Sequence, residues 1–469
     1  MSRVKRVFLI TIDCLRADHV GCIGGKSLTP NIDKLAQDSV VFTRAFANGP
    51  GTNQSFPAIL TSTYFLMHGG MRLLPHCTTL AEALSKHGFE TVAFHSNPFL
   101  SRNLGWSKGF NEFYDFIDII KSPSAAVTRS SLQAKAVKFI DKLIMMLNNR
   151  RIQSILRRFY YRLSEFQIPY IEGSELNKHV IKWITENKKK RFFLWMHYMD
   201  PHRPYVPPPP NLQYFSTRKE AFLFDVFMDS KIGQANISKE ELDKLRGLYE
   251  GEVRYVDNCI GMLIGFLKNE GLLEDSLLIL NADHGEAFLE HNRLTHAFDI
   301  AYNEVIHVPL IIYGLTDHSK VSDDYVQLLD VPPTILDATG IGKPDDFIGD
   351  SLVSTRERHK NSGFIFSESA KPDLINLRYD TSKIVVSCIA DEWKLIINEL
   401  WRTTELYNLK EDFYEEKNLA TIERKICKEL TSLIQEHLSA VSYDRLKTKS
   451  RTAEEKQIKK RLRALGYID

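Results

Sequence analysis

Short, uninterrupted runs of apolar residues recur along the chain and alternate with segments that carry helix signals. The runs occupy residues 7–12, 91–94, 192–196, 276–280 and 308–312. A run of this kind is typical of a strand that is covered on both faces in a mainly parallel sheet. Thr29 followed by Pro30 predicts a helix start, and Thr79 with Glu82 predicts a capping box for a second helix. Strands that alternate with helices predict an open α/β sheet with helices on both faces.

Residues of about 121 to 172 differ from their surroundings, and we interpret them as an insert. Basic side chains far outnumber acidic ones there: Arg129, Lys135, Lys138, Lys142, Arg150, Arg151, Arg157, Arg158 and Arg162. Apolar residues at helical spacing between 137 and 159 predict two amphipathic helices broken at Asn148-Asn149. One interpretation is a helical hairpin with a solvated basic face. The other is peripheral contact with an anionic membrane surface, or with a lipid-linked or polyanionic substrate.

The pattern changes again from about residue 360, where shorter strand signals are followed by a charged helical tail. We therefore expect a large domain over residues 1–360 and a smaller C-terminal α+β subdomain with a terminal helix over residues 361–469.

Composition and charge limit the classes of protein to which this chain can belong. The 469 residues include 61 basic and 59 acidic side chains, a net charge of +2, which gives no reason to expect a nucleic-acid partner. Six scattered cysteines without a CxxC pair favour reduced thiols. The start shows no signal-peptide pattern, and no run of about 18 to 20 apolar residues predicts a membrane span. These features predict a cytoplasmic protein and leave its oligomeric state open.

A carboxylate and an imidazole stand side by side at Asp283-His284, directly after a buried strand. Neighbours on a tight loop can point at one metal ion, and Asp13, which ends the first strand, is a natural third ligand. Oxygen and nitrogen ligands suit Mn²⁺ or Zn²⁺ better than Ca²⁺, although Ca²⁺ stays open. Taken singly, each residue could equally form a turn or a helix cap.

A glycine-rich loop, residues 49–61, leads into a helix. The unpaired N–H groups at a helix N-terminus hold sulfate or phosphate oxygens well. A hydroxyl bound to a metal there loses its proton more easily and becomes a nucleophile. Thr52 and Ser55 are the candidates, and plain N-capping is the alternative for both.

Two groups of histidines accompany these motifs. The first group follows the strand at 192–196 and consists of His197, Asp200, His202 and Arg203. The second group, His291 and His296, comes shortly after the Asp283-His284 pair. This clustering favours leaving-group protonation or anion contact over a purely structural role.

Together these motifs resemble the sulfatase family of the alkaline phosphatase superfamily. The resemblance rests on residues 12–19, with Asp13 and Arg16, then on the segments 29–36, 200–202, 283–286, 308–310, 405–409 and 418–420. They occur in family order and span nearly the whole chain apart from the basic insert. The resemblance implies a mixed, mainly parallel sheet between helices, followed by a small antiparallel C-terminal sheet. It also implies in-line attack on a sulfate or phosphate ester by a metal-bound residue, through a covalent intermediate.

Carried over by position, Asp13, Asp283 and His284 match metal ligands of the family. His202 matches a histidine near the leaving group, and His296 falls where many members carry an active-site lysine. Arg16, in the opening signature, is a further catalytic candidate.

The nucleophile loop departs from the family pattern C/S-x-P-S-R-x-x-L-x-T-G, whose first residue is converted to formylglycine. Counting back from Thr61-Ser62 places Thr52 at that position, and the motif proline and arginine are also absent, so we expect no formylglycine. Cys14 also replaces a frequent second aspartate. Threonine at this position resembles phosphodiesterases, nucleotide pyrophosphatases and phosphoglycerol transferases of the superfamily. A threonine sulfate would lack the elimination route that formylglycine provides, so the nucleophile favours phosphoryl transfer.

The sequence thus predicts a sulfatase-like hydrolase with one divalent ion on Asp13, Thr52, Asp283 and His284, in which Thr52 attacks the ester. An alternative is a phosphodiesterase or phospho(glycerol)transferase with one or two metals, the second held by Asp200, His202 and His296. His197 and His291 remain further candidates near a second metal or the substrate. A third hypothesis is a non-catalytic binder of anionic glycans or lipids.

Overall fold

The computed structural model describes residues 4–26, 28–68, 71–116, 168–229, 231–232, 237–316, 318–353, 363–373 and 378–441. The helices expected in the basic insert and the last part of the charged tail lie outside these residues. The insert's structure and its membrane contact therefore stay predictions.

An eight-stranded sheet forms the centre of the molecule, in the order β4-β3-β5-β1-β6-β7-β2-β8. Its strands are β1 Arg6–Ile12, β2 Ser39–Phe46, β3 Glu90–Phe94, β4 Glu112–Tyr114, β5 Phe192–Tyr198, β6 Ser276–Ala282, β7 His307–Tyr313 and β8 Lys320–Gln327. β1 pairs in parallel with β5 and β6, and only β7 runs antiparallel to its neighbours. The mixed, mainly parallel sheet is confirmed, and all five apolar runs are strands of it.

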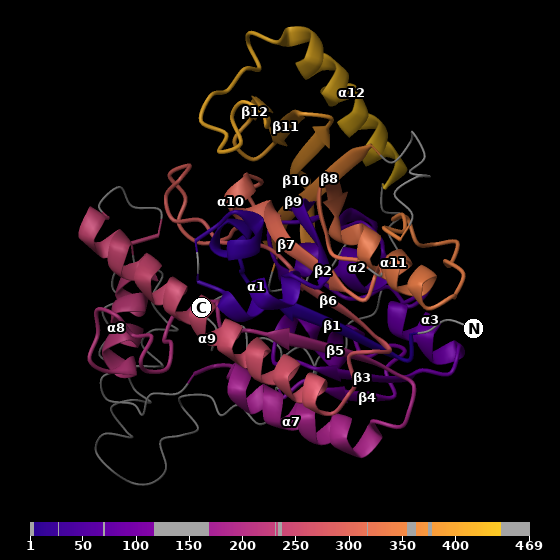
Figure 1. Ribbon diagram of the computed structural model, residues 1–469. Helices are drawn as coiled ribbons and strands as arrows, with labels where there is room; N and C mark the ends of the chain where they lie inside the picture. The colour runs from indigo at the N-terminus through magenta and orange to yellow at the C-terminus, as the bar shows by residue number, and fades with distance from the viewer. Residues whose placement is uncertain are drawn as a thin grey trace.

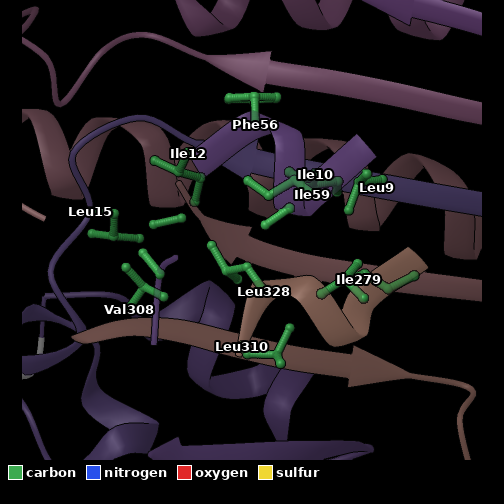
Figure 2. Packing of buried hydrophobic residues seen from close by; sticks show 14 of the residues in the cluster. Leu9, Ile10, Ile12, Leu15, Phe56, Ile59, Ile279, Val308, Leu310 and Leu328 are labelled. Atoms are coloured by element: carbon green, nitrogen blue, oxygen red, sulfur yellow. The ribbon is translucent and has the colours of Figure 1, made fainter. Parts of the chain in front are cut away.

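Both faces of the sheet are covered, because β5 and β6 are buried at every residue. One group of packed helices contains α1 Pro30–Ala36, α7 Gly173–Asn187, α8 Arg218–Asp229 and α9 Lys239–Asn269. A second contains α2 Thr52–Thr61, α3 Leu80–Lys86 and α11 Val331–Ala338. Figure 2 shows Phe56 and Ile59 of α2 close to Ile10 and Ile12 of β1. This packing fixes the N-terminus of α2 relative to the end of β1.

Both predicted helix starts are confirmed, but the two helices are capped differently. The capping box of α3 is present, since Glu82 N donates to Thr79 Oγ1 and Thr79 N donates to Glu82 Oε2, both at 3.0 Å. Thr29 occupies the N-cap position of α1, but its hydroxyl does not cap the helix and instead accepts from Gly21 N. The α1 N–H groups are capped by Asp257 of α9, which accepts from Ile32 N at 2.8 Å.

A smaller antiparallel sheet follows, in the order β12-β11-β10-β9. Its elements are β9 Phe364–Asp373, β10 Arg378–Ala390, β11 Trp393–Asn398 and β12 Thr403–Asn408, with α12 Arg424–Ala440 packed on β10 and β11. Figure 1 shows this unit in orange and yellow above the main sheet, and Glu368 of β9 links the two by accepting from Leu66 N at 2.8 Å. The expected α+β composition is present, whereas the boundary near residue 360 stays a prediction. Among the described helices, none has the length and apolar character needed to cross a membrane.

Candidate functional site

The candidate site lies at the carboxyl ends of three neighbouring strands. Asp13 directly follows β1, His197 is the penultimate residue of β5, and Asp283 directly follows β6. Because β5, β1 and β6 are adjacent and parallel, with Thr11 opposite both His197 and Asn281, these ends meet at one edge of the sheet.

Four fully buried side chains form the centre of the site. Asp13 places Oδ2 3.2 Å from His197 Nε2 and Oδ1 3.4 Å from His284 Nε2, and Asp283 Oδ2 lies 3.6 Å from the same His284 nitrogen. Ligand atoms of Asp13, His197 and Asp283 lie within 4.8 Å of one another, as do those of Asp13, Cys14 and His284. The structure therefore brings together Asp13, Asp283 and His284, three of the four residues that the sequence predicts as metal ligands.

Two of these buried atoms have no hydrogen-bond partner among the described residues, namely His284 Nε2 and Asp283 Oδ2. His284 Nδ1 lies 2.9 Å from the Gly285 carbonyl oxygen. A carbonyl can only accept, so Nδ1 carries the proton and Nε2 keeps a lone pair. Buried polar atoms without partners are costly, and a metal-binding histidine is commonly oriented through its other nitrogen in this way. Two carboxylates and this imidazole therefore fit a divalent cation.

Charges within the site shift the pKa values of the two carboxyl groups in opposite directions. Burial alone would raise the pKa of Asp13, but the neighbouring imidazoles of His202, His197 and His284 hold it far below its ordinary value. Burial and the neighbouring Asp13 carboxylate raise the pKa of Asp283. The two carboxylates thus repel each other across a space where a cation would stabilise both.

Thr52 and Ser55 differ in where their hydroxyls point. Thr52 is the first residue of α2, and its side chain lies close enough to Asp283 to lower the pKa of that carboxyl group. Ser55 Oγ donates to the Gly49 carbonyl oxygen at 2.7 Å, back into the loop. The Ser55 hydroxyl is therefore engaged within its own loop, whereas the Thr52 hydroxyl lies beside the buried carboxylates and accepts from Asn97 Nδ2 at 3.4 Å.

Asn97 joins the site although no motif pointed to it. Its Nδ2 lies 3.2 Å from Asp13 Oδ2 and 3.4 Å from Thr52 Oγ1, so one amide contacts both groups. Asn97 Oδ1 accepts from Phe99 N, which fixes the amide orientation. Asn97 follows the carboxyl end of β3, the next strand beyond β5. In the sequence, the available signal for Asn97 was its position shortly after the apolar run at residues 91–94.

A second group of donors lies beside the first. Cys14, His202 and His296 each offer one ligand atom within 4.8 Å of the others. Cys14 reaches this position through a left-handed backbone conformation, with φ of 59°. Burial lowers the pKa of His202 to about 4, whereas Glu286 outweighs the effect of burial on His296 and raises its pKa. Neither Cys14 as a ligand nor Glu286 as a partner of His296 was foreseen.

Three predicted site residues have their contacts elsewhere. Arg16 donates to both carboxylate oxygens of Asp18, at 2.9 and 2.7 Å, and to Glu290 at 2.7 Å. It also donates to the Glu286 carbonyl oxygen, so it holds the loop after β6 in place and does not contact the donor groups.

Asp200 turns away from the histidines towards α7 and α9, where its Oδ1 accepts from Gly173 N at 2.9 Å. It therefore does not join His202 and His296 as the two-metal alternative requires.

His291 lies 2.8 Å from Glu304 and 3.0 Å from the Glu415 carbonyl oxygen, and its ring stacks on Tyr302. It lines a separate cavity of about 1010 Å³ between the main sheet and the C-terminal unit.

Two family models match the chain. The model described as "Sulfatase" matches residues 5–341, and the one described as "N-sulphoglucosamine sulphohydrolase, C-terminal" matches residues 290–444. The chain belongs to the sulfatase family. It is accordingly a hydrolase of sulfuric or phosphoric esters, within the alkaline phosphatase superfamily.

Three proteins similar to this chain share only 20 to 24% of its sequence. An arylsulfatase of Clostridium perfringens is 24% identical over 393 residues, covering 76% of this chain and 79% of that protein. The multifunctional alkaline phosphatase superfamily protein PehA of Trinickia caryophylli is 22% identical over 479 residues, covering 89% and 91%. The phosphonate monoester hydrolase of Agrobacterium radiobacter has a TM-score of 0.67 at 20% identity, covering 92% of this chain and 96% of that chain. The structural likeness establishes the shared fold.

Proposed function

We propose that this chain is a metal-dependent hydrolase in which Thr52 attacks a sulfate or phosphate ester, with phosphate-type esters as the better substrates. The observation that supports it is the position of the Thr52 hydroxyl, which is 3.4 Å from Asn97 Nδ2, the amide that also contacts Asp13. A divalent ion held by Asp13, Asp283, His284 and Thr52 would lower the pKa of that hydroxyl and neutralise oxygens of the substrate. Mn²⁺ or Zn²⁺ suits these oxygen and nitrogen donors.

The remaining residues have definable roles in such a reaction. Asn97 Nδ2, which contacts both Asp13 and Thr52, orients the attacking oxygen. Thr52 is the first residue of α2, and the positive end of the helix dipole would favour an anionic group bound there. His202 and His296 stand on the side where a leaving group would depart, with ring centroids 5.2 Å apart.

The proposed chemistry has two steps. The Thr52 hydroxyl gives up its proton as its oxygen forms a bond to phosphorus and the bond to the leaving alcohol breaks, and the departing alkoxide takes up one proton, so that the step balances. Water then attacks phosphorus, the Thr52–phosphorus bond breaks, and Thr52 regains its proton. With a sulfate ester the intermediate would be a threonine sulfate, which has no neighbouring hydroxyl to expel sulfate by elimination. This difference supports phosphate-type esters over sulfate esters.

The relatives support the breadth of the substrate class. Their names include an arylsulfatase, a phosphonate monoester hydrolase and a 2-O GAG sulfatase. We infer that the substrate is an anionic ester, with a glycan-linked or lipid-linked group as the variable part. The six free cysteines support the cytoplasmic location inferred from the sequence.

A phosphodiesterase or phospho(glycerol)transferase is the second candidate, and the position of Thr52 favours it as well. In a transferase, an acceptor alcohol would replace water in the second step. Comparing turnover of aryl sulfate, aryl phosphate, aryl phosphonate and bis-aryl phosphate esters, with and without an added alcohol, separates these activities.

The decisive test compares Thr52→Ala with Thr52→Ser and Ser55→Ala. We expect Thr52→Ala to lower turnover by at least about a thousandfold, because it removes the covalent nucleophile. Thr52→Ser keeps a hydroxyl and should retain part of the activity, while Ser55→Ala should affect rate far less. Near-normal turnover by Thr52→Ala together with an inactive, folded Ser55→Ala would show that the other hydroxyl attacks.

A further inference from the structure

The candidate site opens to solvent on the side of His296. The His296 side chain is 13% exposed, whereas Asp13 and Thr52 are buried. The His296 ring lies 4.4 Å from the His284 ring, measured between centroids. A side chain on Gly51, the residue before Thr52, would meet the His296 ring at 3.9 Å. His296 therefore borders both the buried donor groups and the nucleophile loop, and the residues around it form the rim of the site.

Residues 293–299 form the loop that carries His296, and an ion pair joins the two ends of this His296 loop. Arg293 Nη2 lies 3.4 Å from Asp299 Oδ2. His296 is the central residue of the loop, three positions from either end. Even a fully extended chain of that length spans no more than about 11 Å. Both Arg293 and Asp299 are therefore close to the opening of the site.

The turn between β11 and β12 places Trp401 on the joined ends of the His296 loop. Trp401 Nε1 donates to Asp299 Oδ2 at 2.9 Å, and the Arg293 guanidinium lies over the indole ring, 4.9 Å from its centroid. Asn398 fixes the turn as well, since its Oδ1 accepts from Trp401 N at 3.1 Å and its Nδ2 donates to Asp299 O at 3.2 Å. The indole is therefore held by its edge, by one face and by its backbone.

Trp401 is nevertheless 52% exposed. Trp106, Trp183 and Trp195, in contrast, are exposed by 5% or less, as is usual for so large an apolar side chain. A ring that is already fixed by polar contacts loses little conformational freedom when a second ring packs against it. The exposed part of the Trp401 indole, close to the opening of the site, is thus suited to bind a ring of the substrate.

We propose that Trp401 binds the leaving group of the substrate by stacking on its ring, which a sugar or an aryl alcohol supplies. The role of this contact in turnover rests on the proposed function, whereas the binding of a ring to Trp401 does not. His202 and His296 stand on the side where the leaving group departs, and Trp401 extends that side outwards through Asp299. The contact favours esters of ring-bearing alcohols over acyclic ones through affinity, because Trp401 does not reach the reacting atoms.

Steady-state kinetics with phenyl phosphate, glucose 6-phosphate and ethyl phosphate compare an aryl, a sugar and an acyclic leaving group. In Trp401→Ala we expect KM to rise about tenfold, equivalent to ~1.4 kcal/mol, for one or both ring-bearing esters. The kcat values and the KM of ethyl phosphate should stay unchanged. Trp401→Phe keeps an aromatic face and should retain most of the affinity. Tyr414→Ala removes an exposed aromatic ring from the separate cavity and is the matched control.

Acrylamide quenching of tryptophan fluorescence measures ring binding without turnover. Trp401 is the most exposed tryptophan, so the emission that acrylamide quenches readily should be lost in Trp401→Phe. Phenylphosphonate and the phosphonate analogue of glucose 6-phosphate have no ester bond to cleave and serve as ring-bearing probes. We expect one or both of them to protect Trp401 from acrylamide in the wild type, and ethylphosphonate to give no protection.

The outcomes separate this proposal from the proposed function. A KM increase confined to phenyl phosphate identifies an aryl ring as the ligand, one confined to glucose 6-phosphate identifies a sugar ring, and either supports the proposal. An equal loss of kcat with all three esters would show that Trp401 only holds the His296 loop, and this result overturns the proposal. Protection by neither ring-bearing phosphonate overturns it as well. Protection in a protein that hydrolyses none of the esters overturns the proposed function and leaves the stacking site standing.

Discussion

Replacing Asp200 with asparagine should stabilise the protein at pH 8 and leave its metal content unchanged. Asp200 is fully buried, and its Oδ2 has no hydrogen-bond partner among the described residues. Burial raises the pKa of this carboxyl group to about 7, and the backbone N–H of Gly173 only partly offsets the effect. Asparagine has the same shape and can accept the same hydrogen bond from Gly173.

The magnitude follows from the difference between folded and unfolded pKa values. An unfolded aspartate titrates near 3.8, well below the folded value of about 7. The unfolded state therefore loses its proton first, and stability falls as pH rises from about 4 to 7. A pKa difference of this size corresponds to at most about 4 kcal/mol. The asparagine side chain carries no such penalty, so the variant's advantage should grow across this interval and level off above pH 7.

Urea denaturation of wild type and variant between pH 4 and 8 measures the effect, with metal analysis in parallel. Asp18→Asn is an informative control, because hydrogen bonds from His19 and Arg16 outweigh burial and hold the pKa of Asp18 below its ordinary value. That variant should be destabilised at neutral pH and approach wild type in acid. An Asp200→Asn variant that is equally destabilised at every pH would refute the burial argument, and loss of a metal ion would make Asp200 a ligand after all.

Three further predictions concern the site and its surroundings. Metal analysis should show that Asp13→Asn and Asp283→Asn each lose one divalent ion, because each substitution removes a buried ligand and its charge together. Unchanged metal content in both variants would refute the assignment of these carboxylates as metal ligands. His202→Ala should slow alkyl esters much more than nitrophenyl esters, since only a poor leaving group needs a proton or cation; an equal loss for both would count against this role. The pKa of His291 is about 9, since its hydrogen bond to Glu304 outweighs burial. The stabilisation by the protonated His291–Glu304 pair is complete below about pH 6.5 and is lost as pH rises through 9. The unfolding free energy of the wild type should therefore decline by up to about 3 kcal/mol over this interval, and His291→Gln should flatten that decline. A decline that the substitution does not change would exclude the His291–Glu304 pair as its source.

Much of the sheet follows from local patterns, because a strand buried on both faces requires a continuous apolar run wherever it lies. Residues 7–12 and 276–280 needed no tertiary information to be recognised as strands. The Asp283-His284 pair was equally accessible, since two ligand types on one loop after a strand are adjacent in the chain as well as in space. The resemblance to the sulfatase family then connected these separate motifs, because they occur along the chain in the order that the family shows.

The tertiary structure alone decided which side chains meet. β1 lies between β5 and β6, strands roughly 190 and 270 residues later in the chain, and only this order brings His197 and Asp283 to Asp13. Asn97 enters because β3 is the next strand beyond β5, a neighbour that no local pattern specifies.

The spacing of residues in the sequence also could not predict the direction in which each side chain points. Asp200 and His202 are two residues apart, yet the backbone turns the first towards α7 and the second towards His296. Cys14 joins the donor group because its φ of 59° reverses the chain immediately after Asp13. A sequence determines which residues are available for chemistry, whereas backbone dihedral angles and the pairing of distant strands determine which of them share a site.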